Sequence, residues 1–74
     1  MQQLDLHRVR HAEAPEKVRK FLNYAEFPTR IVTGRSKKMR EIVEKTVTEY
    51  GYYCYFESSL NFGALIVNDV NSNI

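Results

Sequence analysis

The feature that most constrains the fold is an apolar stripe in residues 39–50. Apolar side chains recur there at intervals of three and four residues, while charged residues occupy the opposite face. This spacing predicts an amphipathic helix that packs on one side only. Ser36 or Thr33 is placed to cap its start, and Gly51 is placed to end it. The stripe consists of Met39, Ile42, Val43, Thr46, Val47 and Tyr50.

The rest of the chain alternates between strand and helix patterns. A first helix is predicted at 13–25, with Pro15 in its opening turn. The predicted strands span 2–7, 30–33, 52–57 and 62–68. The order β-α-β-α-β-β predicts an α/β two-layer sandwich, in which a four-stranded mixed sheet carries both helices on one face. We expect a single domain over 1–74, with its core in 3–68 and a frayed tail at 69–74.

The composition excludes several classes of protein. Of the 74 residues, 43% are hydrophobic and 27% are charged, as in an ordinary globular chain. No apolar run approaches the roughly 20 residues that span a bilayer, and the N-terminus lacks the apolar segment of a signal peptide. Cys54 is the single cysteine, which rules out an internal disulfide and a multi-cysteine zinc site. We expect a soluble cytoplasmic protein without a membrane partner, a bound metal or a cofactor.

The charge is divided unevenly along the sequence. Residues 1–40 contain ten Lys or Arg and four Asp or Glu, whereas residues 41–74 contain one and five. The N-terminal part therefore carries +6 and the remainder carries −4. This segregation indicates an anionic partner for the N-terminal part, although a solvated surface explains it as well.

Two polar segments follow the first two predicted strands. Asp5, His7, Arg8 and Arg10 follow the first strand, and residues 33–38 follow the second. Ligands of sheets with parallel strands bind outside the carboxyl ends of those strands, where both segments fall. The second segment combines a glycine turn, a helix start and the basic side chains of 35, 37, 38 and 40, which favours phosphate binding.

Asp5 and His7 are two residues apart, so on one strand both would face the same way. A carboxylate beside an imidazole can orient it for acid and base chemistry near neutral pH. The alternative is that Asp5 only bonds backbone amides of the adjoining loop. A third reading, in which His11 joins the two as metal ligands, requires convergence across the loop and has the weakest support.

Aromatic residues gather in the third predicted strand. Alternation places Tyr53 and Tyr55 on one face, with Tyr52, Cys54 and Phe56 on the other. Tyrosines on the helix-free face could stack on bases or contact a protein partner, and ordinary β-propensity accounts for them equally well.

Taken together, the motifs resemble the Smr (small MutS-related) domain family. The resemblance runs from Leu4 to Val67 and rests on LDLH followed by Arg10, on TG at 33–34, and on Gly63 in the last strand. The family pattern is LDLHG or LDxHxxR, then HGxG or TGxG, then a glycine in the closing strand. Its fold, similar to the C-terminal domain of translation initiation factor three, has the element order predicted above.

The resemblance implies DNA nicking or RNA cleavage without an obligate cofactor. Asp5 and His7 match the positions implicated in cleavage. Three residues depart from the family pattern: Arg8 replaces a glycine, Thr33 stands where many nuclease members carry histidine, and Ser36 replaces the last glycine of TGxG. These departures favour nucleic-acid binding over cleavage.

From the resemblance as a whole, the leading hypothesis is a nucleic-acid-binding domain with endonuclease activity, in which His7 is the general acid or base and Asp5 orients it. The alternatives are a binding module without catalysis and a small protein-interaction or inhibitor domain. The residues expected to contact nucleic acid are Arg8, Arg10, Thr33, Gly34, Arg35, Ser36, Lys37 and Lys38.

Overall fold

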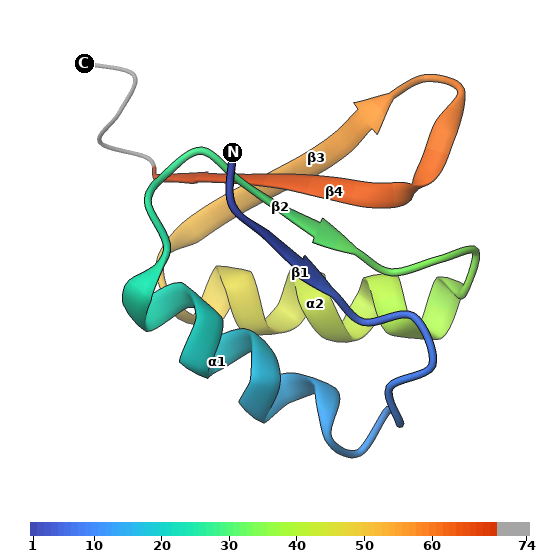
Figure 1. Cartoon of the computed structure of the whole chain (residues 1–74), viewed down its shortest axis with the longest axis horizontal. Helices are drawn as coiled ribbons and strands as arrows, with labels where there is room; N and C mark the ends of the chain where they lie inside the picture. Colours follow the sequence, from blue (N-terminus) through green and yellow to red (C-terminus); the bar gives the residue numbers. More distant parts are fainter. Residues whose placement is uncertain (70–74) are drawn as a thin grey trace.

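The computed structural model describes residues 1–69, which form two helices and four strands (Figure 1). Their order is the predicted one, and all their bounds lie within two residues of the prediction. The chain turns directly after Asp5, so the first strand is shorter than predicted. The predicted tail beyond Asp69 lies outside the described residues. The elements are β1 (Gln3–Asp5), α1 (Ala14–Tyr24), β2 (Thr29–Val32), α2 (Lys37–Glu49), β3 (Tyr52–Ser58) and β4 (Asn61–Asp69).

The four strands form one mixed sheet in the order β1-β2-β4-β3. β1 runs parallel to β2, and β4 runs antiparallel to both β2 and β3. Both helices cover the same face of the sheet, as Figure 1 shows. The predicted two-layer α/β sandwich is thereby confirmed. Neither helix of residues 1–69 is long and apolar enough to cross a membrane.

Helix α2 begins and ends where its sequence predicts. The hydroxyl of Ser36 accepts a hydrogen bond from the Met39 N–H at 3.0 Å, which satisfies one of the free amides at the helix start. Gly51 follows the helix with a φ of +81°, a left-handed conformation that glycine adopts without strain. The buried face of α2 is the predicted stripe reduced to Met39, Val43, Thr46 and Val47.

Helix α1 supplies the second half of the helical layer. Pro15 occupies its first turn, where a missing N–H has no consequence. Its buried residues are Ala14, Val18 and Leu22, and they join α2 and the sheet in one core. From the sheet, this core receives Ile31, Leu65 and Val67, and from the loop after β1 it receives Leu6.

The two faces of β3 follow the predicted alternation. Cys54 pairs with Val67 and packs against the core, whereas Tyr55 pairs with Ile66 on the helix-free face. The rings of Tyr53 and Tyr55 stack there with centroids 6.2 Å apart. Burial raises the pKa of the Cys54 thiol to about 11, with a smaller contribution from Glu44, so the thiol is protonated at neutral pH.

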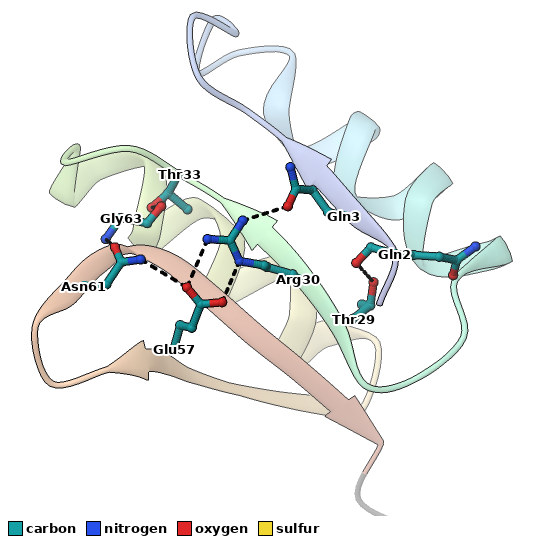
Figure 2. A network of polar contacts seen from close by, with 8 residues as sticks. All are labelled: Gln2, Gln3, Thr29, Arg30, Thr33, Glu57, Asn61 and Gly63. Carbon is teal, nitrogen blue, oxygen red and sulfur yellow. Dashed lines mark hydrogen bonds and ion pairs between the residues drawn. The ribbon is translucent and has the colours of Figure 1, made fainter.

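The helix-free face is closed over its centre by a polar network. Ile66 lies on this face, because it alternates with the core residues Leu65 and Val67, yet it is only 7% exposed. Arg30 lies beside it on β2 and forms a bidentate ion pair with Glu57, with N–O distances of 2.7 and 2.9 Å. Gln3 accepts a hydrogen bond from Arg30 at 2.7 Å, and Asn61 donates one to Glu57 at 3.0 Å; Figure 2 shows this network.

The Arg30–Glu57 pair predicts a specific dependence of stability on pH. The hydrogen bond from Arg30 lowers the pKa of Glu57 in the folded state, so its stabilisation is present above the unfolded pKa of about 4.3 and is lost as pH falls through the folded value. We expect the stability difference between the wild type and Glu57→Gln to be larger at pH 6 than at pH 3. Urea unfolding at both pH values measures it.

Glu16→Gln is the matched control, because Glu16 forms an exposed pair with Lys20 at 3.6 Å. Its stability difference from the wild type is expected to change little with pH. Equal pH dependence of the two variants would contradict the prediction for Glu57.

Candidate nucleic-acid interface

Two loops meet at one end of the sheet, as the parallel pairing of β1 and β2 requires. The Leu6 N–H donates to the Val32 carbonyl at 2.8 Å, which extends the pairing one residue beyond β1. A Cβ placed on Gly34 would lie 3.7 Å from the Cδ2 of His7. The imidazole therefore lies beside the backbone of the second loop, and the two predicted segments form one continuous surface.

The first loop is a tight turn held by Asp5. The Val9 N–H donates to the Leu6 carbonyl at 3.0 Å, and Arg8, the third residue of this turn, has a φ of +69°. A positive φ at that position is the pattern of a type II turn, which normally carries glycine or asparagine. The Asp5 carboxylate accepts the His7 backbone N–H at 2.8 Å. Asp5 thus shapes the turn that presents His7 and Arg8.

The imidazole of His7 is exposed and makes no hydrogen bond to any of residues 1–69. The structure therefore contains the alternative arrangement considered for Asp5, in which its carboxylate binds backbone rather than the ring. Asp5 and His7 also do not share a strand, because β1 ends at Asp5. Any influence of Asp5 on the ring acts through the position of the His7 backbone.

The second loop is held by hydrogen bonds to Gly63 of β4. The Gly63 carbonyl accepts the N–H groups of Thr33 at 2.9 Å and of Gly34 at 3.1 Å. Thr33 is 3% exposed, and its hydroxyl donates to the Gly34 carbonyl at 3.0 Å, so this predicted contact residue is enclosed and holds the loop. Gly34 has a φ of +68°, which a side chain at this position would strain.

Basic side chains surround the start of α2. Arg35, Lys37 and Lys38 are exposed, and the first turn of the helix contains no acidic residue. Cations at a helix start are unfavourable, because the helix dipole already places positive charge there. The hydroxyl of Ser36, also a predicted contact residue, is engaged as the helix cap.

These cations have no acidic partner within residues 1–69. The ion pairs of that part of the chain are Lys20–Glu16 and Arg30–Glu57, both outside the two loops. Arg8 and Arg10 are exposed as well, so the loops together present five cations that are free to meet an anion. They are Arg8, Arg10, Arg35, Lys37 and Lys38.

The alternative metal site is not assembled. Within residues 1–69 no three His, Cys, Asp or Glu side chains come together closely enough to hold a metal ion. Asp5, His7 and His11 therefore do not form the trio considered from the sequence.

Sequence reasoning missed a cleft beside the second loop, which we name the hairpin cleft. It has a volume of about 470 Å³, and its lining comes from the loop before α2, from α2 itself, and from the turn between β3 and β4 with the start of β4. Gly63 was the available signal, since its match to the family pattern pointed to this end of β4. The hairpin cleft is lined by Gly34, Arg35, Arg40, Leu60, Asn61, Phe62 and Gly63.

The conformation of Arg8 predicts that its replacement by glycine stabilises the fold. A left-handed residue with a side chain is disfavoured by about 1–2 kcal/mol, which exceeds the entropic penalty of about 0.5–1 kcal/mol for glycine. We expect Arg8→Gly to raise the free energy of unfolding by about 0.5–1 kcal/mol in urea titrations. Arg10→Gly is the control, since Arg10 does not have a positive φ, and it should lower stability. A loss of stability in both variants would show that Arg8 is not strained.

Comparison with known proteins identifies no relative of this chain. No protein-family model matches the sequence, and no curated protein and no solved structure is significantly similar to the chain. The likeness to the Smr pattern rests on a few residues: LDLH with Arg10, the pair Thr33-Gly34, and Gly63. In the structure, most of these residues shape the two loops or join the second loop to β4.

Proposed function

We propose that this protein binds nucleic acid through the two loops that follow β1 and β2. The observation that carries the proposal is the set of five exposed cations on these loops, none of which is paired with an acid in residues 1–69. Lys and Arg side chains that neutralise phosphates supply most of the affinity in sequence-independent binding. An Smr-like domain is expected to use this end of the sheet.

The stability of the fold does not account for these cations. Lys37 and Lys38 occupy the first turn of α2, where acidic residues are the stabilising choice. Arg8 holds a left-handed conformation at a position that suits glycine. Binding of an anionic ligand explains both features, because the positive helix end and each unpaired guanidinium or ammonium group around it attract the anion.

Cleavage of the bound strand is the second candidate, and the placement of His7 favours it. The imidazole is exposed and lies against Gly34, where the two loops that carry the five cations meet. A neutral imidazole there can accept the proton of the attacking hydroxyl or water, and the imidazolium can return it to the leaving oxygen. Arg8 follows His7 in the sequence and Arg35 follows Gly34, and their guanidinium groups can stabilise charge on the phosphoryl oxygens.

Salt dependence tests the binding proposal. The affinity for a fluorescent single strand should fall linearly on a log–log plot as salt rises, with a slope of about −0.7 per neutralised phosphate. We expect the double variant Lys37→Gln/Lys38→Gln to bind more weakly and to make the slope shallower by about 1.4. Anisotropy titrations between low and moderate salt measure both quantities.

Lys20→Gln is the matched control for this experiment, because Lys20 pairs with Glu16 on α1. Its slope should equal that of the wild type. A flat salt response of the wild type would contradict nucleic-acid binding and would favour the protein-partner alternative, in which the exposed Tyr55 contacts another protein.

The cleavage candidate predicts a large effect at one histidine. His7→Ala should reduce the cleavage rate of labelled RNA or nicked DNA by roughly 10²–10⁴-fold, the usual contribution of a general acid or base. His11→Ala is the control, since His11 is exposed and lies after the turn of residues 6–9 that presents His7, so this variant should leave the rate unchanged. Equal background rates for the wild type and His7→Ala would leave a binding module without catalysis.

A further inference from the structure

We propose that the hairpin cleft receives one unstacked base of a single-stranded nucleic acid whose phosphates lie on the two loops. The proposal rests on the proposed function and adds to it the preference for single strands and the place of the base. The volume of the hairpin cleft, about 470 Å³, falls within the usual range of about 300–1,000 Å³ for small-ligand sites. A base within a duplex is stacked and paired, so only a single strand, RNA or DNA, offers one.

Apolar side chains at the hairpin tip are exposed to solvent and lie outside the hydrophobic core. Leu60 is 94% exposed and Phe62 is 51% exposed, and both line the cleft. Aromatic rings beside a cationic groove are the usual platform for bases in single strands, because every base has a face that can stack. Leu60 offers apolar contact at the outer rim of the same cleft.

The ring of Phe62 is already held in place before a ligand arrives. It meets the Phe56 ring edge-on, with centroids 4.7 Å apart. The Asn61 side chain links the two strands at the turn, since its carbonyl oxygen accepts the Gly63 backbone N–H and its amide donates to the Glu57 carboxylate, each at 3.0 Å. A platform held in this way loses little conformational entropy on binding.

Arg40 brings a cation to the same cleft. Its guanidinium lies 5.6 Å from the centroid of the Phe56 ring and donates to the Phe62 carbonyl at 3.4 Å. It has no carboxylate partner within residues 1–69. Together with Arg35, it places positive charge next to the aromatic platform, the combination that matches a base and its own phosphate.

The hairpin cleft is continuous with the proposed phosphate surface. Gly34 lines the cleft and also lies beside the His7 ring. Gly63 also lines the cleft and accepts hydrogen bonds from the N–H groups of Thr33 and Gly34. A nucleic-acid strand that passes over His7 and Arg35 therefore reaches the cleft directly, because the loop after β2 borders both.

The test compares two labelled ten-nucleotide strands, oligouridylate and the same strand with abasic internal positions, in anisotropy titrations at low salt. The wild type should bind the abasic strand about tenfold more weakly, as expected for the loss of one stacked base. Phe62→Ala should weaken oligouridylate binding about tenfold and leave the affinity for the abasic strand unchanged. Leu60→Ser should weaken oligouridylate binding about threefold, from loss of partial apolar contact.

Leu60→Ser covers the case in which Phe62→Ala disturbs the hairpin, because so exposed a side chain supports no packing. Tyr24→Ala is the matched control, since Tyr24 is an aromatic residue on α1 that is even more exposed than Phe62, and its loss should not affect binding. A deoxyuridine strand separates DNA from RNA, and both should show the same preference for bases.

Equal wild-type affinities for the two strands would overturn the base site while leaving phosphate binding intact. Absence of binding to both strands would overturn the base site and the proposed function together. If Phe62→Ala changed the sedimentation coefficient but not the affinity, the hairpin tip would be a contact between copies, and the proposal would be wrong.

Discussion

The carbonyl oxygen of Gly63 joins the parts of this molecule on which ligand binding is proposed to depend. It accepts the N–H groups of Thr33 and Gly34, so the central strand β4 holds the loop that leads into α2. That loop in turn lies against His7 of the loop after β1 and forms one wall of the hairpin cleft. The arrangement requires β4 to pair with β2, because this pairing places Gly63 beside the end of β2.

Local patterns in the sequence predicted most of the fold. The stripe on α2, the cap at Ser36, the glycine at 51 and the alternation in β3 each act over a few residues, and each is confirmed. The meeting of the two loops was also predictable, since parallel neighbours end at the same edge of a sheet. The side-chain partners were not predictable in this way. Asp5 had several acceptable donors, and the structure selects the His7 amide over its ring.

Contacts between distant strands escaped prediction for a related reason. The hairpin cleft depends on how far the turn between β3 and β4 extends past β2, and a bulge between Phe56 and Ser58 alters that reach. The sequence predicted Thr33 and Ser36 as contacts to nucleic acid; in the structure the Thr33 hydroxyl bonds within the loop, and the Ser36 hydroxyl forms the predicted helix cap. The residue types correctly predicted a polar and basic surface. Which of its residues shape the loops and which are free to bind a ligand depends on tertiary structure.

The polar network on the helix-free face has a consequence for how the sheet is aligned. Gln3, Arg30, Glu57 and Asn61 belong to four different strands, and their side chains meet only in the observed alignment. Sliding one strand by a single residue would turn its member to the other face and leave a charge without its partner. The network therefore selects one register among neighbouring ones, in a sheet whose first strand has only three residues with which to specify its own position.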